Sequence, residues 1–215
     1  MNTEEALERI YQTFATRKGP ATIVACPCCL DQNEVCALLK TPLRKITPSQ
    51  LSGYASSVFL TSGSEKDFRY FLPRILEISY REQYWWPDRE VVLGKLTLAN
   101  WMNWSEKEID TLHSFFEVAF DQALQCGDEA SYEVDSWICA LALAGADVGP
   151  YLRKLEDPAQ QDVLLGYFEL NAAELQKDKL GNAFWNGDMT LATPIINWFQ
   201  SAQIQSVIWR HYGSA

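Results

Sequence analysis

Residues 105–125, SEKEIDTLHSFFEVAFDQALQ, carry the clearest structural signal in this 215-residue chain. Their apolar positions recur every three or four residues, as on the buried face of an amphipathic α-helix. Ser105 with Glu108 three residues later matches the capping box that begins a helix, and Gly127 follows where the helix would end. The pattern predicts a helix over 106–125 whose core face comprises Ile109, Leu112, Phe116, Ala119, Phe120 and Ala123.

Similar helix signals recur along the chain, whereas the alternating pattern of β-strands is almost absent. Helix starts are expected at Thr3, Asp31, Thr47, Ser64, Asp88, Asp157, Thr193-Pro194 and Ser201. Pro73 should kink or divide the helix that begins at Ser64. Residues 21–25, ATIVA, are the one expected extended piece. We therefore predict an all-α fold, either an irregular multi-helix bundle or a HEAT-like stack of short helices.

The composition indicates the size of the core and the cellular setting. Apolar residues make up 47% of the sequence, and 8 Trp, 9 Tyr and 10 Phe suffice for a large core. No linker separates two cores, so we predict one all-helical domain over residues 1–215. The longest apolar stretch, residues 137–146, is about half of the roughly 20 residues that cross a bilayer. Because residues 1–10 are acidic, unlike a signal peptide, the expected location is the cytoplasm, with no membrane partner.

The net charge of −10 argues against nucleic acid as a partner, because phosphate binding requires clustered Lys and Arg. An acidic protein is better suited to a partner with a basic surface. Glu106, Asp110, Glu117 and Asp121 recur at helical spacing opposite the apolar face of the helix predicted over 106–125. We call these four residues the acidic stripe and regard it as a candidate partner-binding surface, although simple solvation explains the same pattern.

Residues 80–90, YREQYWWPDRE, form a second candidate surface, in which aromatic side chains lie among charges. Such a group is either a corner of the core or an exposed anchor for a partner. Trp85 and Trp86 are consecutive, so on a helix their side chains point about 100° apart. We expect one of them to pack inward and the other to be partly exposed and available to a partner.

Four of the six cysteines lie in residues 24–36, VACPCCLDQNEVC. Cys26 and Cys29 form a C-x-x-C, a spacing with which two thiolates can hold one zinc ion. A second C-x-x-C is absent, although structural zinc usually has four ligands. Cys36, Cys126 and Cys139 are expected within helices, where a small apolar residue would serve equally well. The motif is therefore either a metal or thiol site or a turn that leads into a helix.

Other catalytic signals are scarce. His113 lies three residues after Asp110 and four before Glu117, so a metal site on one helix face is conceivable, but a solvated charged face is the favoured interpretation. The chain contains no G-x-S-x-G, no glycine-rich phosphate loop and no H-E-x-x-H. We therefore assign no catalytic residue.

Residues 67–77, DFRYFLPRILE, and the upstream CPCC resemble an uncharacterised family of bacterial all-helical proteins. Its members carry an N-terminal C-P-x-C followed by D-[FY]-R-[HY]-F-L-P-R-x-L-E, and the later pieces SWICALALAG, PYL and NAFW are also similar. The resemblance implies no established activity or ligand set. From the residues themselves, we expect Asp67 to complete the cap at Ser64 and Arg74 to pair with Glu77.

These features predict a non-enzymatic protein-binding protein, of which an inhibitor or immunity protein that covers a basic cleft is one form. The competing prediction is a metal- or thiol-dependent enzyme or sensor that uses Cys26 and Cys29. Fold class alone does not decide between them.

Overall fold

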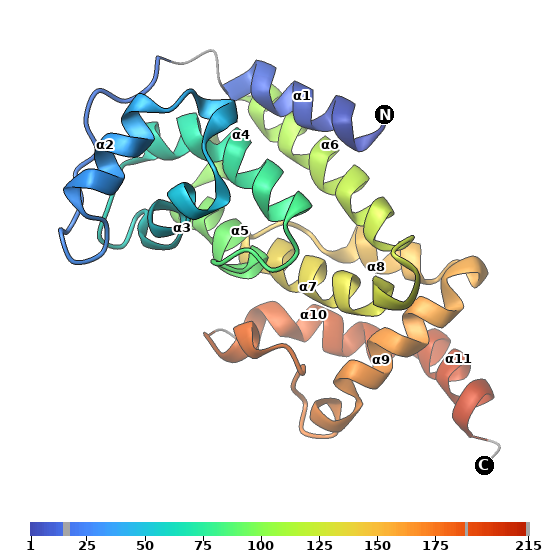
Figure 1. Ribbon diagram of the computed structural model, residues 1–215. Helices are drawn as coiled ribbons and strands as arrows, with labels where there is room; N and C mark the ends of the chain where they lie inside the picture. Colours follow the sequence, from blue (N-terminus) through green and yellow to red (C-terminus); the bar gives the residue numbers. More distant parts are fainter. Residues whose placement is uncertain (15–17, 188, 214–215) are drawn as a thin grey trace. The chain divides into compact units, whose positions relative to one another are not determined.

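The computed structural model describes residues 1–14, 18–187 and 189–213 (Figure 1). Within these ranges the regular structure is helical, and the all-α prediction is confirmed. The α-helices are α1 (Thr3–Phe14), α2 (Gln32–Lys40), α3 (Pro48–Ser57), α4 (Glu65–Arg81), α5 (Arg89–Leu98), α6 (Glu106–Ala123), α7 (Ala130–Leu143), α8 (Gly149–Leu155), α9 (Gln161–Leu175), α10 (Met189–Phe199) and α11 (Ala202–Tyr212). Short 3-10 helices lie at η1 (Leu43–Lys45), η2 (Trp101–Asn103), η3 (Gly127–Glu129), η4 (Pro158–Gln160) and η5 (Ala183–Gly187).

Residues 21–25 do not form a strand. Ala25 makes an isolated antiparallel bridge with Ser62, and the described residues contain no β-sheet. None of the helices in these residues has both the length and the apolar composition that crossing a bilayer requires.

Contacts divide the chain into two compact units, Met1–Ala119 and Phe120–Ala215. In the first unit, α1 packs on α4, α2 packs on α3, and α5 contacts both α3 and α4. Its largest fully buried side chains are Ile10, Phe14, Tyr54, Phe68, Phe71, Trp101, Phe115 and Phe116. The single domain expected over residues 1–215 stays a prediction.

In the second unit, α7 packs on α9, and α10 contacts both α7 and α8. A partly buried polar network ties the segment before η5 to these helices. Asp135 on α7 accepts hydrogen bonds from Nδ2 of Asn171 (3.2 Å) and Nδ2 of Asn182 (2.9 Å), while Oδ1 of Asn171 accepts from the Gly181 amide (2.7 Å). Burial raises the pKa of Asp135 despite these two hydrogen bonds.

Four of the eight expected helix starts, Asp31, Thr47, Ser64 and Ser201, are confirmed by the hydrogen bonds of their caps, and Asp88 begins α5 without one. Asp31, Thr47 and Ser64 each form a complete capping box, and Asp67 is the third helical residue of the last one, as expected. Helix α1 is capped by Asn2 rather than Thr3, because Oδ1 of Asn2 accepts from the Glu5 amide at 2.9 Å.

The start predicted at Pro194 is wrong, and of the two outcomes predicted for Pro73, division of the helix is wrong. Helix α4 runs from Glu65 to Arg81 with Pro73 inside it, and the apolar residues on both sides of the proline are buried. Pro194 lies inside α10 instead of beginning it, and buried residues again flank the proline on both sides. Burial along a continuous face outweighs the hydrogen bond that proline removes.

The Asp157 and α6 predictions also need correction. The Asp157 carboxylate accepts from the Ala159 amide (2.9 Å) and begins η4, so α9 starts only at Gln161. Helix α6 ends at Ala123 rather than near residue 125. On its core face Ile109 is only half-buried, whereas Glu108 and Phe115 are buried.

The segment at residues 67–77 has a structural role in α4. Arg74 pairs with Glu77 (2.6 Å), as predicted, and its Nε also donates to the Ile46 carbonyl (2.7 Å). Arg69 donates to the buried Glu108 on α6 (3.0 Å), and its guanidinium lies 4.1 Å from the centre of the Trp104 ring. Both arginines therefore serve packing within the first unit.

Candidate thiol and metal site

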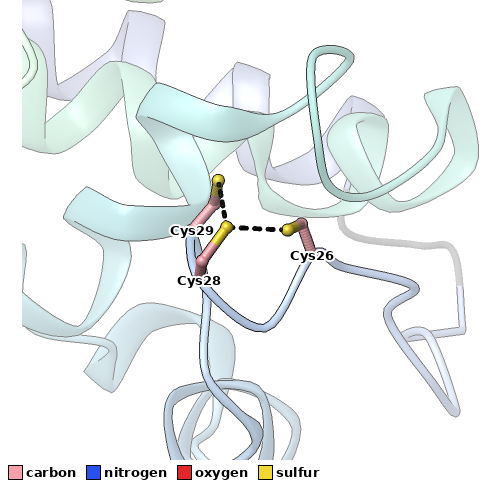
Figure 2. Close-up of side chains that lie close together, drawn as sticks. All are labelled: Cys26, Cys28 and Cys29. Atoms are coloured by element: carbon pink, nitrogen blue, oxygen red, sulfur yellow. Dashed lines mark hydrogen bonds between the residues drawn. The ribbon is translucent and has the colours of Figure 1, made fainter.

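Three cysteine thiols converge on the exposed turn that precedes α2 (Figure 2). The Sγ atoms of Cys26 and Cys28 are 2.8 Å apart, and those of Cys28 and Cys29 are 3.7 Å apart. All three sulfur atoms lie within 4.8 Å of one another. With a Zn–S bond of about 2.3 Å, two thiolates on one tetrahedral ion lie about 3.8 Å apart. Small side-chain adjustments would therefore let all three sulfurs ligate one ion.

Backbone hydrogen bonds close this turn. The Cys26 carbonyl accepts from the amides of Cys29 (2.9 Å) and Leu30 (3.1 Å), which closes the turn. The Cys26 amide donates to the Thr61 carbonyl (2.8 Å), so the turn is fastened to the loop that follows α3. The Leu30 side chain is buried, and the capping box at Asp31 then starts α2. The cysteines are thus presented on a fixed backbone.

The thiols change one another's acidity. A hydrogen bond from the Cys28 thiol, helped by the Cys28 amide, lowers the pKa of Cys26. The same bond, with the neighbouring sulfurs, raises the pKa of Cys28 to about 11. In the described part of the chain, no lysine or arginine contributes to either shift. Cys26 is therefore more acidic than Cys28, and a cation bound beside Cys28 would favour its thiolate form.

A bound ion would have an open coordination position. Among the described residues, these three cysteines are the only set of three or more His, Cys, Asp or Glu side chains placed to hold a metal ion. Cys36 lies on α2 and is outside the set. With three protein ligands, a tetrahedral ion keeps one position for water or another exogenous ligand.

Cys28 is the residue that the C-x-x-C interpretation missed. The signal was present in the sequence, because CPCC places three cysteines in four consecutive positions. The ends of a four-residue turn lie within about 7 Å, which is close enough for the three cysteine side chains of this turn to meet. Of the other cysteines, Cys36 and Cys139 lie in helices as predicted, whereas Cys126 lies just beyond the end of α6.

The second metal arrangement considered from the sequence is not supported. His113, Asp110 and Glu117 are absent from the sets that could hold an ion in the described residues. The His113 ring instead packs against Trp101, with ring centres 5.2 Å apart.

The acidic stripe lies on α6, and part of its charge is already matched. Glu106 and Asp110 are exposed and border a cleft of about 360 Å³ that also contains Arg9 and Lys107. Asp121 pairs with Lys154 at 2.5 Å. Glu117 is half-buried. The stripe stays a predicted partner surface.

The expected division between Trp85 and Trp86 is confirmed. Trp85 is 8% exposed, and its indole N–H points to the Pro48 carbonyl (3.0 Å) and Oγ of Ser52 (2.8 Å). Trp86 is 61% exposed. Both residues lie in the loop between α4 and α5, so the divergence comes from loop geometry rather than from the turn of a helix.

Comparisons with protein-family models, curated proteins and solved structures return no match for this chain. The site is therefore interpreted from its own chemistry, and the family resemblance stays a prediction.

Proposed function

We propose that this protein binds one thiophilic metal ion, Zn²⁺ or Cu⁺, through Cys26, Cys28 and Cys29. The observation that supports the proposal best is the convergence of three sulfur atoms within 4.8 Å on one backbone turn. Thiolates favour soft ions of this kind over Mg²⁺ or Ca²⁺. The ion would supply positive charge beside Cys26 and Cys28, to whose pKa shifts no lysine or arginine of the described chain contributes.

The exposure of the site points to an exchangeable ion rather than a structural one. Cys28 and Cys29 are exposed, and the turn is closed by its own hydrogen bonds. An ion at this place would have an open ligand position toward solvent, which suits a sensor or a carrier. The cytoplasm, where thiols stay reduced, is the compartment that we propose for it.

Metal titration of the reduced, tag-free protein tests the proposal. We expect one equivalent of Zn²⁺ or Cu⁺ to bind, and Co²⁺ to give the charge-transfer absorption of thiolate ligation. Replacing Cys26, Cys28 or Cys29 by Ser should each weaken binding by at least about tenfold. Cys36→Ser is the matched control and should bind as the native chain does. Native-like binding by the triple Ser variant would contradict the proposal, and competition between Zn²⁺ and Cu⁺ identifies the preferred ion.

Protein binding, including inhibition of a basic partner in the manner of an immunity protein, is a second proposal. The observation that favours it is the large exposed area of Trp86, because tryptophan is enriched at interface hot spots. Trp86→Ala should weaken the complex with a partner recovered from the native host, without changing the melting temperature by more than a few degrees. A complex of unchanged affinity would remove Trp86 from that interface.

A further inference from the structure

A pair of exposed aromatic side chains lies on the loop between α4 and α5. Tyr84 is 93% exposed and Trp86 is 61% exposed. Aromatic side chains usually bury most of their area, because each contributes a large apolar surface. Two such side chains, separated by one residue in sequence, are left in solvent on the same loop. We call Tyr84 and Trp86 the aromatic pair.

The loop that carries the aromatic pair is firmly anchored. Trp85, between the two exposed residues, is 8% exposed and donates its indole N–H toward α3, to Pro48 and Ser52. The Trp85 amide donates to the Glu82 carbonyl (3.0 Å), and Pro87 is buried. A fixed loop loses little conformational entropy on binding, so the aromatic pair is preorganised for contact.

The carboxylates beside the aromatic pair are exposed and have no ion-pair partner among the described residues. Glu82 and Asp88 lie at the two ends of the loop, and both are exposed. Asp88 is the N-cap residue of α5, yet its carboxylate makes no capping hydrogen bond. The nearest exposed cation in sequence, Arg81, is occupied by Glu4 (2.7 Å) and Glu77 (3.4 Å). The loop thus offers two carboxylates and two aromatic faces.

The exposed aromatic rings and carboxylates of this loop together favour a cationic partner. The faces of Trp and Tyr attract ammonium and guanidinium groups, and free carboxylates pair with the same groups. The net charge of −10 repels nucleic acid, anionic membranes and a second copy of the chain alike. We infer that the aromatic pair, flanked by Glu82 and Asp88, is a docking surface for an arginine- or lysine-bearing segment of another protein.

Binding of a defined peptide to the full-length, metal-free protein tests this inference. The probe is a fluorescently labelled peptide of about ten residues with alternating Arg and Ala, and the reference is its Glu and Ala counterpart. Trp86→Ala and Tyr84→Ala should each weaken binding of the arginine peptide by at least about tenfold, with no change in net charge. Glu82→Gln with Asp88→Asn should weaken it by a similar factor. The glutamate peptide should not bind.

Matched controls separate docking from general attraction to an acidic protein. Trp209 is 72% exposed and Tyr132 is 60% exposed, and both lie in the other unit. Trp209→Ala and Tyr132→Ala should leave affinity for the arginine peptide within twofold of the native value, roughly 0.4 kcal/mol. Circular dichroism and melting temperature confirm that each variant is folded.

Four results would overturn the inference. The first is no binding of the arginine peptide by the native protein up to about 1 mM peptide, and the second is an equal loss of affinity in the control variants. The third is unchanged affinity in the Tyr84 and Trp86 variants. The fourth is self-association of the protein that depends on the aromatic pair. Use of the metal-free protein keeps this outcome independent of the thiol site.

Discussion

The Tyr11 hydroxyl donates a 2.6 Å hydrogen bond to Oε2 of Glu77 and thereby joins α1 to α4. The same oxygen also accepts from Nη1 of Arg74 at 2.6 Å. Burial raises the pKa of Tyr11, and the bond to Glu77 adds to this effect. Burial alone would also raise the pKa of Glu77, but hydrogen bonds from Tyr11 and Arg74 outweigh it and leave the pKa below its ordinary value. Glu77 is thus a half-buried carboxylate held in its ionised form.

We expect Glu77→Gln to lower the free energy of unfolding by about 2 kcal/mol, because it leaves the Arg74 guanidinium without its carboxylate. Tyr11→Phe should cost about 1 kcal/mol. Urea titrations of both single variants and the double variant give the coupling between the residues. Coupling near zero would mean that the bond between them adds nothing to stability.

The contribution of Glu77 should also depend on pH. Because the folded-state pKa is depressed, the stabilisation is fully present above the ordinary value of 4.5 and is lost as pH falls through the folded-state pKa. The difference in unfolding free energy between the native protein and Glu77→Gln should therefore shrink in acid. A difference that stays constant down to about pH 3 would contradict this assignment.

Cysteine alkylation should follow acidity rather than exposure. Cys26 is less exposed than Cys28, but its pKa is lowered, whereas that of Cys28 is raised to about 11. Iodoacetamide at about pH 8 should therefore modify Cys26 before Cys28, as read by tandem mass spectrometry. Cys28→Ala removes the thiol hydrogen bond and should slow the reaction of Cys26. If Cys28 reacts first, exposure and not the thiol hydrogen bond determines the order of alkylation.

Removal of metal should leave the fold intact. The turn at Cys26 is closed by backbone hydrogen bonds and anchored by buried Leu30, so its conformation does not depend on an ion. Chelation should leave the far-UV circular dichroism of the reduced protein unchanged, in contrast to zinc fingers, which unfold without metal. Loss of helical signal on chelation would show that the ion is structural.

Two glycines allow backbone strain and side-chain crowding to be separated. Gly63 and Gly127 both have positive φ, at 65° and 59°. A Cβ at Gly63 would lie 2.9 Å from the Tyr54 ring, whereas a Cβ at Gly127 would meet nothing within 4 Å. Gly127→Ala should cost about 1 kcal/mol of stability from strain alone. Gly63→Ala should cost roughly 1–3 kcal/mol more in urea unfolding, because the fully buried Tyr54 must move.

Local chemistry explains which parts of the fold were predictable. The starts of α2, α3 and α4 follow from residues within three positions of each cap, because those hydrogen bonds are local. The uninterrupted course of α4 past Pro73 depends on burial against other helices. The ion pair of Arg69 with Glu108 joins residues 39 positions apart, so only the folded chain brings them together.

At the candidate sites, too, some features follow from the local sequence and others depend on tertiary contacts. The C-x-x-C indicated the correct turn but missed Cys28, since the motif counts only its first and last cysteine and does not describe the thiol between them. Trp85 and Trp86 diverge as predicted, yet the cause is a loop whose anchor to Pro48 lies 37 positions away. The sequence patterns located the cysteine turn and the loop between α4 and α5. Tertiary contacts determined which side chains of each are exposed to a ligand or partner.

The backbone link between the cysteine turn and the loop after α3 also makes the thiols observable at a distance. The Cys26 amide donates to Thr61, and the Gly63 amide donates to the carbonyl of Val24, so one pair of bonds clasps the two loops. We expect metal binding or oxidation at the sulfur atoms to change how often these two backbone hydrogen bonds open. Deuterium uptake at the Gly63 amide would therefore report ligation of Cys26, Cys28 and Cys29 from a residue that bears no thiol.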